Sequence, residues 1–463
     1  MAWKESRPGH WERPLGDNES MLRVIAEGDG QIEKDIWCIF ATAQFDAQLV
    51  ESRSQDFLFA ALLSGWKLLR FRHPSIATVI CEDTVRYDVP DDTALDLWTR
   101  DTFNVVDDAQ ICSGDLIAQM PPSRWANLHY LKHRSSVVLQ LSHWRTDGVG
   151  ALHLLNAFFH AVTDGLRNEI PEEGQLIWGK EVIRLTPSVE EALHLSFTPT
   201  TNEQSAAQKF LDTLAYHRDA LAVSNQNSKH NQLTPSATRS IESSFSMAET
   251  KELLEMCHTC EISLQAAVHA AVTTTAFTIA DPASTLLHHS TTVRQSLRPC
   301  LPPPYDGSAG AAGLYTAGYV MKVPPLQLWL QYAQRYEAEY QQGVTEELIC
   351  SRRHYARAMK DLLSTRRPKQ VTPGPSGLDI SYIADAESLV QPVHASSEGE
   401  IVIRRIGIQV EVASRYLYVF AWVFNAKLEL HLVFNEGFYD SDFTAEILSH
   451  VRKHLITNLL SLP

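Results

Sequence analysis

Apolar and polar positions along the chain follow either the period of a strand or the period of a helix. The sharpest change from one period to the other falls about a third of the way along the chain. Val137–Leu141 is a short apolar run rich in β-branched residues, which predicts a buried strand. Ala151–Val162 places Leu, Phe and Val residues at helical spacing, which predicts a helix. Ser142–Gly150 is therefore predicted to be a strand-to-helix turn that carries a histidine, an aspartate and two glycines.

The same patterns predict an α/β chain on both sides of this turn. Before it, strands at Ile36–Ala41 and Ile76–Cys81 flank a predicted helix over Asp46–Trp66, and the first twenty residues predict an extended arm. After it, we expect strands at Ala237–Met247, Leu286–Val293, Leu378–Ile383, Ile401–Val412, Arg415–Trp422 and Leu428–Phe434, and helices at Gln204–Leu221, Glu249–His258, Ser263–Ile279, Leu326–Glu347 and Asp442–Leu460. Alternation of this kind is typical of α/β folds.

A shift in composition predicts where the chain divides. A linker-like patch is formed by Pro187, Pro199, Thr200, Thr201 and Asn202, and Ser224–Ser236 is rich in Ser, Asn and Gln. We therefore expect an N-terminal lobe over 1–185, a linker with one helix over 186–236, and a C-terminal lobe over 237–463.

Charge and composition narrow the class of protein. The chain has 40 Lys and Arg against 55 Asp and Glu, a formal charge of −15, so nucleic acid and anionic membrane surfaces are poor partners. Met1–Pro8 is polar with no apolar region after it, and the longest apolar run, Tyr416–Phe424, is far shorter than the ~20 residues of a spanning helix. Seven scattered cysteines favour free thiols in a reducing compartment. We expect a cytoplasmic protein.

His143 is the candidate for acid–base chemistry. At the end of a core strand, a neutral imidazole can take a proton from a hydroxyl, amine or thiol. The alternative is a hydrogen-bonded histidine of the core. Asp147 can cap the following helix or bind a distant arginine, and Gly148 is expected to free the backbone for a tight turn. Trp144, Arg145 and Thr146 are left without an assigned role.

Other chemistries lack support in the sequence. Cys257–Cys260 has no second cysteine pair at metal-binding distance, and His288 and His289 point to opposite faces of a predicted strand. No Gly-x-Ser-x-Gly, Gly-x-Gly-x-x-Gly or Walker sequence occurs. The sequence thus offers one candidate base, His143, and neither a protein nucleophile nor a metal site. This set of groups fits the direct transfer of a chemical group between two bound substrates.

Five segments carry a family resemblance, and one of them, the Ala-rich helix over Ser263–Ile279, resembles the helix that precedes the corresponding strand in condensation domains. His143–Gly148 matches the His-x-x-x-Asp-Gly signature of the CoA-dependent acyltransferase superfamily, which includes BAHD acyltransferases, chloramphenicol acetyltransferase and condensation domains. Thr291–Pro302 resembles the BAHD segment in which an arginine precedes a Pro-x-Leu-Pro loop. Trp11–Gly16 and Leu432–Asp440 are most similar to fungal secondary-metabolite O-acyltransferases such as trichothecene O-acetyltransferases. The resemblance implies two chloramphenicol-acetyltransferase-like lobes, each a mixed sheet flanked by helices, with an active-site tunnel at their interface.

The resemblance also implies roles for individual residues. His143 would be the general base, and Asp147 with Gly148 would brace the turn through an ion pair that points away from the substrates. Arg294 is the expected partner of Asp147, and Arg298 is the alternative.

Two departures from the family pattern matter for the reaction. Ser142 stands where condensation domains carry a second histidine, which disfavours peptide-bond formation. Asp379–Asp385 takes the place of the BAHD Asp-Phe-Gly-Trp-Gly motif, and Ser381 within it is a candidate for binding an oxyanion or a substrate.

The predicted function is acyl transfer from acyl-CoA, as co-substrate, to a hydroxyl of a small secondary metabolite, with an amine as the weaker alternative. No metal and no tightly bound cofactor are expected. Two alternatives remain open: a condensation-like enzyme that acts on the thioester of a carrier protein or cyclises a polyketide or terpenoid intermediate, and a binding protein that kept the tunnel and lost the chemistry.

Overall fold

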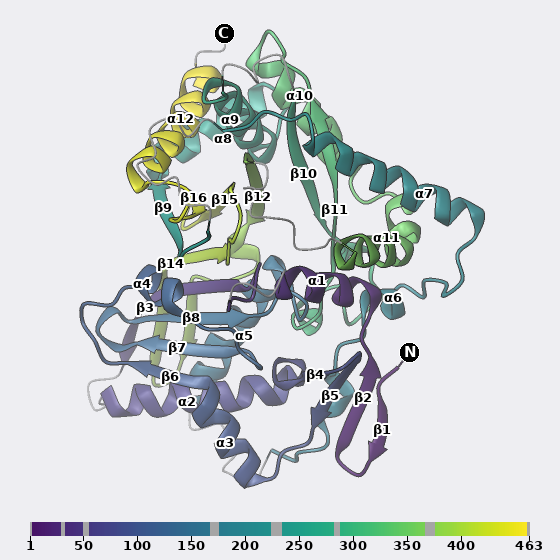
Figure 1. Cartoon of the computed structure of the whole chain (residues 1–463). Helices are drawn as coiled ribbons and strands as arrows, with labels where there is room; N and C mark the ends of the chain where they lie inside the picture. Colours follow the sequence, from purple (N-terminus) through teal and green to yellow (C-terminus); the bar gives the residue numbers. More distant parts are fainter. Residues whose placement is uncertain are drawn as a thin grey trace.

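The computed structural model describes residues 2–28, 33–49, 55–166, 176–223, 234–281, 288–365 and 376–460. In these ranges the chain forms the α/β fold that the sequence predicts, with two large sheets, a small N-terminal sheet and a long hairpin (Figure 1). No helix within the described ranges combines the length and apolar character needed to cross a membrane.

The first large sheet has six strands in the order β13-β14-β3-β8-β7-β6. Its strands are β3 (Ile39–Leu49), β6 (Phe103–Val106), β7 (Asn127–Leu131), β8 (Ser136–Leu141), β13 (Val393–Ser396) and β14 (Gly399–Val410). Helix α5 (Gly148–Leu166) packs on the sheet and α2 (Gln55–Arg72) packs on α5, whereas α3 (Asp92–Thr102) and α4 (Ser113–Gln119) contact the β6–β8 side. All six residues of β8 are buried, as expected for a central strand.

The second large sheet has four strands in the order β12-β15-β16-β9. Its elements are β9 (Thr238–Ser244), β12 (Gly377–Asp385), β15 (Tyr416–Phe424) and β16 (Lys427–Asn435), with α8 (Met247–Thr259), α9 (Leu264–Thr278) and α12 (Ser441–Leu460) packed against them. Ser263 caps α9 by accepting a hydrogen bond from the amide of Ala266, and the Ala-rich helix is buried on most of its length. Ser263–Ile279 is thus a buried helix, as the sequence predicts.

A hairpin and a group of helices lie beside the two large sheets. The hairpin pairs β10 (His289–Ser296) with β11 (Thr316–Val323), and after it come α10 (Trp329–Gln342) and α11 (Glu346–Ser364). Figure 1 shows α11 beside α1 (Asp17–Glu27), and α7 (Thr201–Asp212) also packs on α11. The short α6 (Val189–Ala192) contacts α1.

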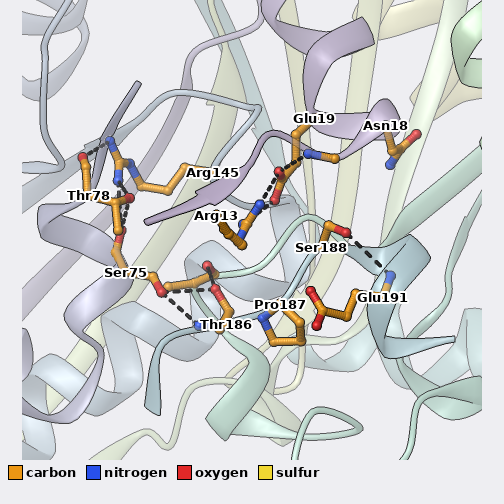
Figure 2. Close-up of polar contacts among 12 residues, drawn as sticks. Arg13, Asn18, Glu19, Ser75, Thr78, Arg145, Thr186, Pro187, Ser188 and Glu191 are labelled. Carbon is orange, nitrogen blue, oxygen red and sulfur yellow. Dashed lines mark hydrogen bonds and ion pairs between the residues drawn. The ribbon is translucent and has the colours of Figure 1, made fainter. Parts of the chain in front are cut away.

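The N-terminal segment differs from the predicted extended arm. It forms β1 (Lys4–Arg7) and β2 (His10–Pro14), which pair with β5 (Thr84–Asp88) and β4 (Val79–Cys81) in a four-stranded sheet, and then α1. Arg13 and Glu19 join the strand to the helix through a buried bidentate ion pair (Figure 2). A buried charge pair of this kind leaves no periodic signal in a short segment.

Three predicted helices have wrong bounds. The helix predicted over Gln204–Leu221 is α7, which ends at Asp212 and is followed by a 3-10 turn over Thr213–His217. Residues 46–49 belong to β3, and the helix predicted over Asp46–Trp66 is α2, which begins at Gln55 within the described residues. The helix predicted over Leu326–Glu347 ends at Gln342, because Gly343 takes a left-handed φ of 63° and Thr345 caps a new helix, α11.

The predicted lobes share one sheet. Strands β13 and β14 come from the predicted C-terminal lobe, yet β14 pairs antiparallel with β3 in the first large sheet. The lobe bounds at 185 and 237 stay predictions. Of the predicted linker, α7 and a 3-10 turn over Thr213–His217 are described, and residues 224–233 lie outside the described ranges, as do 286–287 of the strand predicted from Leu286.

Candidate active site

The predicted strand-to-helix turn is present, between β8 and α5 (Figure 1). Strand β8 ends at Leu141, the amide of Arg145 donates to the carbonyl of Ser142 (3.0 Å), and α5 begins at Gly148. The Ser142 hydroxyl donates to Asp35 (2.5 Å) and is therefore engaged away from any nucleophilic role. The φ of Gly148 is not in the left-handed region that favours glycine. The prediction that the turn needs the backbone freedom of glycine at this position is therefore wrong.

His143 is half-buried and lines a cavity. Its Nδ1 lies 3.0 Å from the carbonyl oxygen of Thr146. Because a carbonyl can only accept, Nδ1 carries the proton and Nε2 keeps the lone pair. Burial lowers the pKa of His143, the charge of Arg294 acts in the same direction, and the charge of Asp147 opposes them. The imidazole is thus a neutral acceptor of protons at neutral pH.

The partner of Asp147 is Arg298, and the expected pairing with Arg294 is wrong. Arg298 Nη1 lies 2.6 and 2.8 Å from the two carboxylate oxygens, and both side chains are buried. Asp147 also accepts from the amides of Gly150 (2.9 Å) and Tyr315 (2.8 Å). Strand β10 ends before Arg298, and the 3-10 turn that follows brings Arg298 to the start of α5, whereas Arg294 stays on the strand.

Arg294 instead binds Asp379 on the neighbouring strand β12. Its Nη2 lies 2.8 Å from Asp379 Oδ2, its Nη1 donates to the carbonyl of Ile380 (2.6 Å), and its guanidinium lies 5.7 Å from the ring centre of Tyr418. Burial alone would raise the pKa of Asp379, but Arg294 and a hydrogen bond from Thr291 hold it well below its usual range. Both charged groups line the cavity together with His143.

Arg145, in the unassigned middle of the motif, anchors the turn. Its buried guanidinium donates to the carbonyl of Ser75 (2.7 Å) and to the hydroxyl and carbonyl of Thr78 (2.6 and 3.0 Å), as Figure 2 shows. Ser75 in turn bonds Thr186 (2.9 Å). Burial lowers the pKa of Arg145 to about 9, which still leaves the side chain charged at neutral pH. An isolated buried arginine leaves no pattern in the sequence, so the sequence does not predict that Arg145 anchors the turn.

Trp37 is a second residue that the sequence did not single out. Its backbone has a left-handed φ of 66°, and its amide donates to the carbonyl of Glu411 (2.9 Å). The indole lies 6.3 Å from the ring of His143 and lines the cavity. A strained backbone at such a place is typical of functional sites.

The cavity lies where the two large sheets and the hairpin meet, and it measures about 1580 Å³. Its walls include His143 after β8, Arg294 on β10, and Ser381 and Tyr418 on β12 and β15. Pockets for drug-sized ligands measure roughly 300–1,000 Å³. The space is therefore large enough for more than one small substrate. Within the described ranges, no group of three or more His, Cys, Asp or Glu is placed to hold a metal.

Comparison with known proteins identifies relatives over the whole chain. Acetyltransferase pigO of Monascus ruber is 37% identical over 461 residues, which cover 99% of this chain and 98% of the relative. O-acetyltransferase pigM of Monascus ruber is 28% identical over 462 residues, which cover 98% of this chain and 87% of pigM. No protein-family model matches the chain.

Among solved structures, the TRI3 trichothecene 15-O-acetyltransferase from Fusarium sporotrichioides matches with a TM-score of 0.81. The match covers 98% of this chain and 97% of TRI3 at 14% identity, so it shows a shared fold. The predicted fold class, with chloramphenicol-acetyltransferase-like sheets flanked by helices, is confirmed.

Proposed function

Because the chain belongs to the CoA-dependent acyltransferase superfamily, together with the fungal acetyltransferase pigO, we propose that it moves an acyl group from acyl-CoA to a hydroxyl of a small secondary metabolite. The family supports acyl transfer in secondary metabolism. The CoA donor, the hydroxyl acceptor and the roles of individual residues are the further content of the proposal. An amine acceptor would use the same base.

One observation carries the proposal: the cavity between the two sheets presents a histidine in the tautomer that a base requires. The hydrogen bond from Nδ1 to Thr146 leaves the Nε2 of His143 without a proton. The lowered pKa keeps the imidazole neutral at the pH of a cell. Neither a bound metal nor a protein nucleophile is needed when both substrates occupy one cavity.

In the proposed reaction, Nε2 of His143 takes the proton of the acceptor hydroxyl. The oxygen attacks the thioester carbonyl carbon, a C–O bond forms, and the negative charge moves to the carbonyl oxygen. The C–S bond then breaks, and the proton passes from His143 to the CoA sulfur. The products are an ester and free CoA, and the enzyme returns to its starting protonation state.

Ser381 is the proposed hydrogen-bond donor to the carbonyl oxygen during this step. It lines the cavity on β12, two positions from Asp379 and therefore on the same side of the strand. A preorganised donor at the developing negative charge is typically worth about 10²–10³ in rate.

The proposal is tested by acyl-CoA dependence. We expect free thiol and an ester of matching mass when the protein meets acetyl-CoA and a panel of hydroxylated polyketides. The leaving CoA is detected with a thiol reagent, and the ester by mass spectrometry. Transfer from a carrier-protein thioester, with no CoA release from any acyl-CoA, would contradict the proposed donor.

A further inference from the structure

One side of the cavity is walled by three helices rather than by strands. Helices α1, α7 and α11 contribute mainly apolar side chains here: Met21, Leu22, Ile25, Leu211, Tyr355 and Met359. This part of the cavity surface is called the helical wall below. It is distinct from the sheet-borne residues around His143, and the proposed chemistry does not use it.

Helix α11 presents one continuous face to the helical wall. Arg352, Tyr355, Met359 and Leu362 all line the cavity and follow each other at intervals of three or four residues. At 1.5 Å per residue, this face is about 15 Å long. Arg352 is 3% exposed and Leu362 is 43% exposed, so the face runs from a buried end to an open end.

The buried end carries a positive charge without a carboxylate partner. In the described part of the chain, the Arg352 guanidinium makes one hydrogen bond, from Nη2 to the side-chain oxygen of Asn18 (2.5 Å), and its Nε has none. It also lies 4.8 Å from the ring centre of Tyr355. The carboxylate of Glu190 acts on Arg352 through its charge, but no ion pair joins the two among the described residues: one Glu190 oxygen accepts the amide of Asn18 (2.7 Å), and the other has no hydrogen-bond partner there.

The neighbouring arginines of α11 are paired. Arg353 and Arg357 bind the same carboxylate, that of Asp17, at 2.8 and 2.9 Å. The Nε of Arg353 also lacks a hydrogen-bond partner in the described residues, so the difference lies in the carboxylate. A buried cation that contacts no carboxylate is costly unless another anion pairs with it. Arg352 faces the cavity, so a bound ligand can supply that anion.

We propose that Arg352 is a binding site for an oxyanion at the end of an elongated apolar ligand. The oxyanion, a carboxylate or a phosphate, pairs with the guanidinium, and the hydrocarbon part lies along Tyr355 and Met359. If the proposed function holds, the ligand is one of its substrates, and the oxyanion belongs either to an acid-bearing acceptor or to CoA.

Binding measurements on the whole protein test this site without turnover. Octanoate and 1-octanol share a hydrocarbon chain and differ in charge. We expect calorimetry to show that the Kd of octanoate is at least about tenfold higher for Arg352→Gln than for wild type, because the variant loses a charge-assisted contact. Binding of 1-octanol should be the same in both. Arg353→Gln, which removes a charge one residue away and outside the cavity wall, should match wild type.

A second probe separates the two sources of the oxyanion. If the site serves CoA, adenosine 3′,5′-bisphosphate will bind more weakly to Arg352→Gln and octanoate will not distinguish the proteins. If neither probe distinguishes Arg352→Gln from wild type, the proposal is wrong.

Two further variants keep the test decisive if Arg352→Gln does not fold. Arg352→Lys retains the charge and should retain part of the octanoate affinity. Met359→Trp fills the helical wall without touching the guanidinium contact to Asn18, and it should abolish octanoate binding. If wild type and Met359→Trp bind octanoate equally and also bind adenosine 3′,5′-bisphosphate equally, the proposal is wrong. If no acyl transfer is detected by CoA release, that result counts against the proposed function and leaves the binding test of Arg352 unaffected.

Discussion

Arg298 holds both carboxylate oxygens of Asp147 with a single terminal nitrogen, across 151 positions of sequence. Two backbone amides, from Gly150 and Tyr315, complete the coordination of the carboxylate. The ion pair ties the start of α5 to the segment after β10. His143 sits four residues before this point, so the pair fixes the turn that carries His143.

Asp147→Ala should therefore destabilise the fold. The substitution leaves Arg298 as a buried unpaired cation and frees two buried amides, and the loss of one member of a buried pair typically costs about 3–5 kcal/mol. Arg298→Lys should also destabilise, because an ammonium cannot reproduce the guanidinium contacts. The free energy of unfolding in urea measures both. As a control, Arg404→Ala breaks an exposed pair with Asp46 and should cost less than about 1 kcal/mol. Equal costs would contradict the bracing role.

The two glycines of the motif should respond differently to alanine. A Cβ at Gly150 would overlap Thr146 and the carbonyl of Ala311 and lie 2.7 Å from Arg298. A Cβ at Gly148 would meet only the tips of Ile383 and Ile408, at 3.3 Å. Gly150→Ala should therefore lower the melting temperature sharply.

Gly148→Ala is the matched control for Gly150→Ala and should stay within about 1 kcal/mol of wild type. The melting temperatures of the two variants, measured by thermal unfolding under the same conditions, test this difference. A Gly150→Ala protein that melts like Gly148→Ala would show that α5 does not pack as described.

Arg294 should help to lower the pH at which the enzyme loses activity in acid, although burial of His143 has the larger effect. Burial lowers the pKa of His143 and the charge of Arg294 lowers it further, so the imidazole of His143 takes up a proton only at a pH below the usual pKa of histidine. Arg294→Gln removes that charge and leaves Asp379 uncompensated, which should raise the pKa of His143. The acid limb of the kcat/KM profile should then move to higher pH, whereas Arg294→Lys should leave it nearly in place. An unchanged limb in Arg294→Gln would contradict this electrostatic role.

His289 should make the fold sensitive to acid. Burial lowers its pKa to about 4, whereas the unfolded chain titrates near 6.5. The unfolded state therefore binds the proton first, and stability falls as pH drops from about 6.5 towards 4, by up to about 3 kcal/mol. His289→Gln should make the pH dependence of the melting temperature less steep in that range, where the other buried histidines also titrate. Equal slopes in wild type and His289→Gln would be evidence against this account.

The turn could be predicted from sequence because its signals are local. A run of buried β-branched residues, a helix period and a histidine-to-glycine motif all fall within 137–162. The partner of Asp147 could not be predicted in this way. Arg294 and Arg298 are four positions apart, and only the end of β10 and the 3-10 turn after it decide which one reaches α5.

Other features of the site have no local signal. Arg145 and Arg352 are buried arginines whose partners, Thr78 and Asn18, lie far away in sequence. The left-handed backbone of Trp37 depends on its contact with Glu411. The pairing of β14 with β3 also joins distant segments, which is why the composition shift near the middle of the chain did not reveal a shared sheet.

The central claim is that His143 is the base for acyl transfer from CoA. The most direct test compares the rate of acceptor-dependent CoA release by wild type and His143→Ala, with His133→Ala as the control on the other end of β8. We predict a loss of at least roughly 10²–10⁴-fold in His143→Ala with an unchanged melting temperature, and no loss in His133→Ala. Retention of most of the activity by a folded His143→Ala protein would contradict the claim.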